Sequence, residues 1–311
     1  MRQKEEIRKM ANYLFRNSRN VTAPGLYNGK AGVSLSLFIA SKYLQDEELE
    51  DRAYRLLQES IIHKNDDLSF ENGLAGIGYA LLYLSENQYV EADFHEIFPE
   101  QYEKIIKINI GGAPLLLLNS LQLVYFLSKA GKSKEDHRTG KIIEKIFEGV
   151  EVFLTVQFHD FTDIQYTNNK TGVLNIYTTY LKLIDYSGYA HFSRLLPDDY
   201  AALYQEGKIV SSLETGYYLK KITDSYHIKG YEDVINENIC NGAKGAYPCT
   251  LTLKERVDMA KLTGDRAYEI PANMPIQNLL KTVDKNSYPL GYGAGLGRLL
   301  IYLVDKDIEL L

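Results

Sequence analysis

Two glutamates and one cysteine lie at equivalent positions of a recurring motif, where their side chains could take part in a reaction. Glu71, Glu214 and Cys240 each lie two positions before a glycine of a motif that recurs along the chain. If the fold brings the two carboxylates to one cavity, they can act as general acid and general base on a sugar, as in glycoside hydrolases. Each residue also has a plainer interpretation: Glu71 caps a helix, Glu214 is a solvated acid and Cys240 is a small buried apolar residue. Whether the catalytic or the plainer interpretation holds depends on the helices and loops that carry these three residues.

The composition excludes several classes of protein. The chain has 311 residues and a net charge of −6, without the basic stripe that a nucleic-acid-binding protein presents. Its N-terminus is charged and lacks the apolar core of a secretory signal. The longest apolar run, residues 113–118, is far shorter than the ~20 residues that cross a bilayer. Because two cysteines are also too few for a disulfide framework, we expect a cytoplasmic protein with no membrane span and no nucleic-acid partner.

A glycine motif recurs along the chain. Residues 28–32 read Asn-Gly-Lys-Ala-Gly and residues 72–76 read Asn-Gly-Leu-Ala-Gly, while residues 241–245 keep the Asn-Gly-x-x-Gly frame. Residues 294–303 repeat the apolar sequence that follows the second copy. Looser copies begin at Gly111, Asn168 and Glu214. A motif that recurs at this scale indicates a repeat architecture.

The fold class is predicted from the two kinds of segment that follow and separate the motifs. Each motif leads into a run that is apolar on nearly every side, which is typical of a buried helix. Residues 47–63 and 134–153 instead space their apolar side chains at helical intervals among charges, which indicates surface helices. This alternation predicts an all-α protein, a single α/α toroid domain over residues 1–311 with six to seven helical hairpins in a double ring. The motifs would line its central funnel; an open helical solenoid is the alternative.

The motif segments resemble a known family. Residues 25–32 and 72–84 are similar to the repeat of the lanthionine synthetase C-like family, whose members are α/α toroids with seven such motifs, and copies here run across the whole chain. The resemblance implies a funnel zinc that activates a peptide cysteine for addition to a dehydrated serine or threonine, as in lantibiotic biosynthesis. Because this chain is short for the family, residues 216–242 are expected to hold a trimmed hairpin.

The family's zinc positions are only partly kept. The resemblance places Cys240 at one ligand position, Asn241 where the ligand histidine is expected and Glu214 where the other cysteine is expected. Asn168 occupies the place of the histidine that moves the proton. Since asparagine is a poor zinc ligand, we expect no cofactor, or zinc only if the family site survives.

The corresponding positions of the other motifs predict a ligand site. The expected substrate-binding residues at the funnel mouth are Asn28, Glu71, Asn72, Asn169 and Thr215. The sequence thus predicts a lanthionine synthetase C-like protein of a ribosomal peptide modification pathway. It would bind a ribosomally made precursor peptide, or the enzymes that modify it, without zinc-dependent thioether cyclisation. The alternative is an active enzyme: a peptide cyclase with unusual zinc ligands, or a carboxylate-based glycoside hydrolase.

Overall fold

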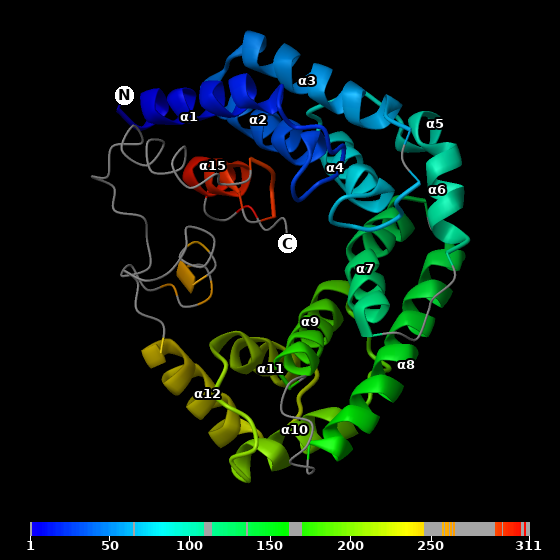
Figure 1. Ribbon diagram of the computed structural model, residues 1–311, viewed down its shortest axis with the longest axis vertical. Helices are drawn as coiled ribbons and strands as arrows, with labels where there is room; N and C mark the ends of the chain where they lie inside the picture. Colours follow the sequence, from blue (N-terminus) through cyan, green and yellow to red (C-terminus); the bar gives the residue numbers. More distant parts are fainter. Residues whose placement is uncertain are drawn as a thin grey trace. The chain divides into compact units, whose positions relative to one another are not determined.

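The fold is helical wherever the computed structural model describes the chain, namely residues 2–64, 66–108, 114–134, 136–161, 170–245, 290–293 and 295–305 and a few isolated positions (Figure 1). This part of the chain contains thirteen helices and no strands, so the all-α prediction is confirmed for it. None of its helices is long and apolar enough to cross a membrane. The helices are α1 (Arg2–Ser18), α2 (Lys30–Leu44), α3 (Glu47–Ile62), α4 (Leu74–Glu86), α5 (Phe94–Ile97), α6 (Pro99–Ile106), α7 (Pro114–Lys134), α8 (His137–Asp160), α9 (Lys170–Ser187), α10 (Leu195–Gln205), α11 (Leu213–Ser225), α12 (Glu232–Gly245) and α15 (Leu296–Val304).

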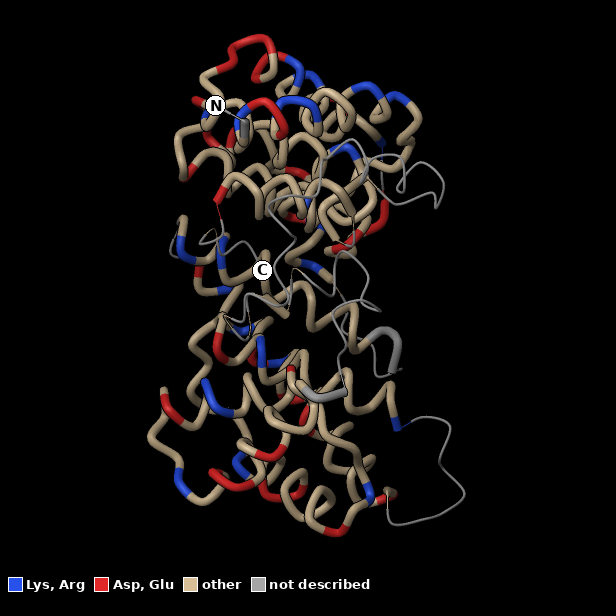
Figure 2. Tube along the Cα trace, turned by 90° about the vertical axis from the view of Figure 1, so that its left-hand side faces the viewer, with Lys and Arg blue, Asp and Glu red and all other residues tan. Residues whose placement is uncertain are grey.

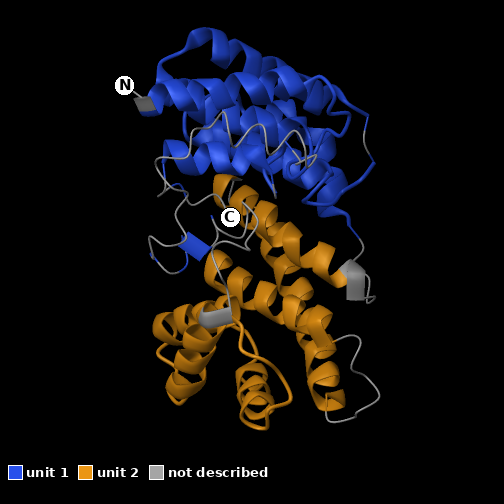
Figure 3. Cartoon of the chain, turned by 60° about the vertical axis from the view of Figure 1, so that its left-hand side comes forward, with its two compact units in different colours: residues 1–108, 251–311 blue, residues 109–250 orange. Residues whose placement is uncertain are grey.

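The chain divides into two compact units (Figure 3). Unit 1 comprises residues 1–108 and 251–311 and contains α1 to α6 and α15. Unit 2 comprises residues 109–250 and contains α7 to α12. In both units, lysine and arginine are interspersed with aspartate and glutamate along the described trace (Figure 2).

Two glycine motifs of unit 1 start buried helices, as predicted. Helix α2 begins after Gly29 and α4 after Gly73, and nearly every residue of both helices is buried. Helix α3 packs on α2 and is amphipathic, which confirms the surface helix expected from residue 47 onward. The carboxylate of Asp46 accepts a 3.1 Å hydrogen bond from the Leu49 amide and so caps its first turn.

The C-terminal motif helix joins the same core. Helix α15 packs against α2 and α1, which come from the other end of the chain (Figure 1). The approach is close because the motif glycines lack side chains: a Cβ on Gly32 would lie only 2.8 Å from the backbone nitrogen of Tyr292. A Cβ on Gly297 would lie only 2.6 Å from the Ser36 hydroxyl oxygen. The glycines therefore set the spacing between motif helices.

Unit 2 has an aromatic core. The rings of Phe158, Tyr177, Tyr180 and Tyr200 are buried, and the Tyr177 ring stacks on the Tyr200 ring with centroids 5.0 Å apart. Aromatic pairs of this kind add to the free energy gained by burial. The core joins helices α8, α9 and α10.

One surface helix begins and ends later than its sequence pattern predicts. Residues 134–153 were expected to form it, but α7 continues through Lys134 and α8 spans His137–Asp160. The boundary is set by Asp136, whose carboxylate accepts a 2.9 Å hydrogen bond from the Arg138 amide at the start of α8.

The motif at residues 241–245 does not start a helix, contrary to the prediction. It forms the last turns of α12, where a Cβ on Gly242 would collide with the backbone nitrogen of Leu213. The glycine thus serves the close packing of α12 on the start of α11, the same purpose that it serves elsewhere at a helix start. Helices α11 and α12 have 13 and 14 residues, similar to the 13 of α4 and fewer than the 18 of α9.

Candidate functional site

The predicted residues of unit 1 lie on adjoining motif loops. The Tyr27 amide donates a 2.7 Å hydrogen bond to the Glu71 carbonyl oxygen, and the backbone of Gly25 lies directly against that of Asn72. The Asn28 side chain is exposed, while those of Glu71 and Asn72 are half-buried. The structure therefore brings these three polar residues to neighbouring loops, at the starts of α2 and α4.

The C-terminal motif adds a third loop to this group. The amides of Tyr292 and Gly293 donate hydrogen bonds of 3.2 and 3.0 Å to the carbonyl oxygens of Leu26 and Tyr27. The ring of Tyr27 contacts those of Phe70 and Tyr292, with centroids 6.0 and 6.3 Å apart. Each of the three loops therefore contributes one ring to a shared aromatic cluster. We call this group of loops, residues 25–30, 69–73 and 290–293, the motif rim.

The predicted residues of unit 2 have different surroundings. Glu214 is exposed in the first turn of α11, where the helix dipole favours a carboxylate. Thr215 is only 1% exposed, and its hydroxyl oxygen lies 2.6 Å from that of Thr178 on α9. Thr215 therefore holds α9 and α11 together.

The sequence analysis missed a buried asparagine beside these residues. The Asn238 carboxamide oxygen accepts hydrogen bonds from the Tyr200 hydroxyl and the Ser212 amide, each 2.9 Å long. Its nitrogen donates a 2.8 Å hydrogen bond to the Val234 carbonyl oxygen, and the side chain is fully buried. Its position between apolar residues of an amphipathic helix is the signal that could have identified it.

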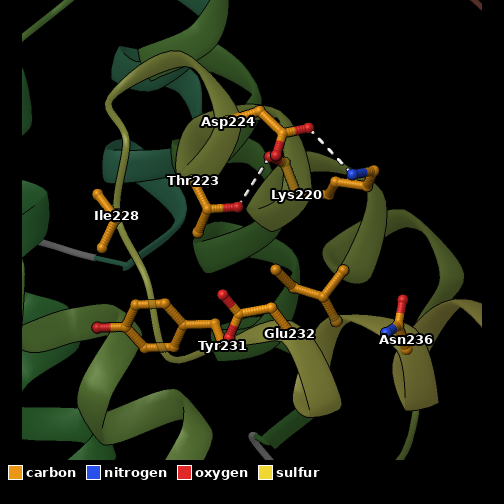
Figure 4. Close-up of a pocket in the computed structure, with 8 residues that line it drawn as sticks. Lys220, Thr223, Asp224, Ile228, Tyr231, Glu232 and Asn236 are labelled. Carbon is orange, nitrogen blue, oxygen red and sulfur yellow. Dashed lines mark hydrogen bonds and ion pairs between the residues drawn. The ribbon is translucent and has the colours of Figure 1, made fainter.

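A small pocket lies at the opposite end of α11 (Figure 4). It has a volume of about 200 Å³ and lies between α11, α12 and the loop that joins them. Glu214 and Thr223 are nine residues apart on α11, which corresponds to roughly 13 Å along the helix. The pocket therefore does not include the predicted residues of unit 2. Its lining residues are Lys220, Thr223, Asp224, Ile228, Tyr231, Glu232, Ile235 and Asn236.

The polar groups of this pocket are engaged with one another. The Lys220 ammonium lies 3.0 Å from an Asp224 carboxylate oxygen, and a Glu232 carboxylate oxygen accepts a 3.0 Å hydrogen bond from the Gly230 amide. The Tyr231 hydroxyl donates a hydrogen bond to the Asp198 carboxylate. Burial, followed by that carboxylate, raises the pKa of Tyr231 to about 12. The pocket suits a small polar group, but nothing in it points to a particular reaction.

A family match decides how the motif rim is interpreted. Residues 2–116 match the model of the lanthionine synthetase C-like protein family. Over this segment the chain is similar to that family. The match confirms the resemblance inferred from the first two motifs, and it includes Asn28, Glu71 and Asn72. No curated protein matches the chain.

The lanthionine synthetase C-like match does not reach the positions of the family's zinc ligands, so their fit is judged from this structure. Cys240 and Asn241 are exposed and consecutive in α12, so their side chains leave the helix about 100° apart. Within the described residues, no three His, Cys, Asp or Glu side chains are grouped so that they could hold a metal ion. Cys240, Asn241 and Glu214 do not fit a zinc site, because such a site needs three good ligands. Asn168, Asn169 and Cys249 lie outside the described residues.

Proposed function

We propose that this lanthionine synthetase C-like protein binds a ribosomally made precursor peptide, or an enzyme that modifies it, at the motif rim. One observation carries the proposal: three motif loops are hydrogen-bonded side by side, with Asn28 exposed next to Glu71 and Asn72. A peptide offers amide donors and acceptors at regular intervals, and each hydrogen bond contributes a net ~0.5–1.5 kcal/mol. The half-buried ring of Tyr27 provides apolar contact area for its side chains.

We also propose that the protein does not perform zinc-dependent thioether cyclisation. The argument is the chemistry of the donors: asparagine stands at Asn241, and glutamate stands at Glu214. Zinc analysis of protein purified without chelator tests this part of the proposal. Stoichiometric zinc that is lost in Cys240→Ala would overturn it and favour a cyclase with unusual ligands.

For the whole chain we propose a single α/α toroid domain of six to seven hairpins in the cytoplasm. Buried motif helices alternate with amphipathic helices along the chain, as such a ring requires. Helix α15 packs beside α1 and α2, which supports closure between the two ends of the chain.

Peptide binding is tested with candidate precursor peptides chosen from small open reading frames next to the gene of this protein. We expect Asn28→Leu to weaken peptide binding about fivefold, because one or two hydrogen bonds are lost while the exposed side chain leaves the fold unchanged. Asn236→Leu is the matched control, an exposed asparagine that lines the pocket of unit 2 instead. If Asn236→Leu weakens binding and Asn28→Leu does not, the peptide binds at that pocket and the proposed site is wrong.

A further inference from the structure

Lys182 is held between two tyrosine rings. Its ammonium nitrogen lies 5.6 Å from the ring centroid of Tyr125 on α7 and 5.8 Å from that of Tyr218 on α11. Lys182 itself belongs to α9, so one cation contacts three helices of unit 2. Cation–π contacts of this kind fix the position of the charge without neutralising it.

No carboxylate neutralises this charge within the described part of unit 2. Lys182 takes part in none of the ion pairs or hydrogen bonds formed there, and its side chain is half-buried. Lys221 offers a direct comparison, since its ammonium lies 5.3 Å from the Tyr217 ring centroid but also 3.3 Å from an Asp185 carboxylate oxygen. The two lysines have similar aromatic contacts and differ in their counter-ion.

Two charged side chains, Lys182 and Glu214, act on the Tyr218 phenol. Tyr218 lies one turn after the exposed Glu214 on α11. Burial raises the pKa of Tyr218, and the Lys182 charge acts against that rise, which places the ammonium within electrostatic reach of the phenol. Glu214 raises the same pKa and is the one acidic group among these influences. Tyr125 is buried and Tyr218 is half-buried, so packing holds both rings in place beside the ammonium.

We propose that Lys182, between Tyr125 and Tyr218, binds a carboxylate of an acidic peptide segment. This inference goes beyond the proposed function, because it gives unit 2 an anion site of its own, distinct from the motif rim of unit 1: the ligand is a peptide segment that carries acidic side chains or ends in a free carboxylate. A lysine whose position is already fixed loses less side-chain entropy on pairing than a mobile surface lysine. Its half-buried setting also reduces the screening of the interaction by solvent.

Labelled hexapeptides test the site directly. The probes are an amidated peptide of alternating glycine and glutamate, its glutamine counterpart and the glutamine peptide with a free C-terminal carboxylate. We expect the glutamate peptide to bind, and Lys182→Met to weaken that binding about tenfold, because methionine keeps the contacts with the rings but removes the charge. Lys221→Met is the matched control and should leave the affinity unchanged. Binding of the free-carboxylate peptide alone would identify the C-terminus as the source of the anion.

The variant Glu214→Gln should change the affinity for the glutamate peptide in the opposite direction. Removing this negative charge should strengthen binding of the glutamate peptide about threefold, with a smaller effect at high salt. Equal affinities of all three peptides, or equal affinities of Lys182→Met and the parent protein for the peptide that binds, would overturn the site. So would the absence of binding by every probe. The precursor-peptide assay with Asn28→Leu still measures the proposed function in those cases, so the two failures are distinguishable.

Discussion

The Tyr292 amide donates a 3.2 Å hydrogen bond to the carbonyl oxygen of Leu26, which joins the last motif of the chain to the first. The Gly293 amide donates the equivalent hydrogen bond, 3.0 Å long, to the carbonyl oxygen of Tyr27. The rings of Tyr27 and Tyr292 are also in contact. Backbone bonds between loops persist only where the loops approach closely, and the motif glycines permit that approach. The core of unit 1 is therefore built from both ends of the sequence.

Truncation from Tyr288 onward should unfold unit 1 cooperatively rather than shorten it. The deletion removes α15 and uncovers apolar side chains of α2, which no other helix of the described unit is placed to replace. Circular dichroism should show loss of the cooperative thermal transition. A normal melt for the truncated protein would contradict the role given to α15.

Gly32→Ala should destabilise the protein by about 2–4 kcal/mol, because the added methyl group collides with the Leu26 carbonyl oxygen. Gly149→Ala on α8 is the matched control. No atom lies within 4 Å of its added methyl group, so alanine should stabilise that helix by roughly 0.5–1 kcal/mol. Urea unfolding of both variants measures the difference, and equal shifts would show that the close approach at Gly32 contributes nothing.

Asn238→Leu should cost about 3 kcal/mol or more. The substitution keeps the volume but leaves the Tyr200 hydroxyl and the Ser212 amide without their common acceptor inside the core. In the double variant with Tyr200→Phe, one of the orphaned donors is gone, so part of the loss should be recovered. Urea unfolding of the two single variants and the double variant gives the coupling energy; strict additivity would contradict the shared hydrogen bond.

The sequence predicts the motif helices well because their pattern is local. Residues 30–44 are apolar on all sides and follow a glycine, and no tertiary information is needed to identify a buried helix there. The motif at 241–245 shows the limit of this reasoning. The same glycine frame serves a helix end as readily as a helix start, and what decides is the contact between Gly242 and Leu213, two residues on different helices.

The surroundings of single side chains also could not be predicted from the sequence. Periodicity shows that Thr215 and Asn238 lie on helices, but it does not show which helices are neighbours. Their partners, Thr178 and Tyr200, come from α9 and α10. The exposed position of Asn28 and its approach to the loop of Glu71 likewise depend on packing between two motifs. Tertiary contacts of this kind decide whether a polar residue faces a ligand or the core.

Stability should fall steeply above pH 10, and the tyrosines of unit 2 give the reason. Burial raises the pKa of Tyr177 and Tyr180, and Tyr180 also donates a 2.6 Å hydrogen bond to a Glu151 carboxylate oxygen. The unfolded chain releases phenolic protons from about pH 10, whereas the folded chain keeps them. Because the unfolded state then binds fewer protons, the free energy of unfolding falls as pH rises, by about 1.4 kcal/mol per pH unit for each such tyrosine. Below pH 10 both states are protonated and this contribution to stability is fully present.

Exposed tyrosines such as Tyr54 should ionise first, in the folded protein. The remaining phenolate absorbance, from the buried tyrosines, should therefore rise in step with the loss of helical circular dichroism, and Tyr180→Phe should reduce the slope by one proton. Complete phenolate formation in a protein that keeps its native circular dichroism would contradict the burial of these hydroxyl groups.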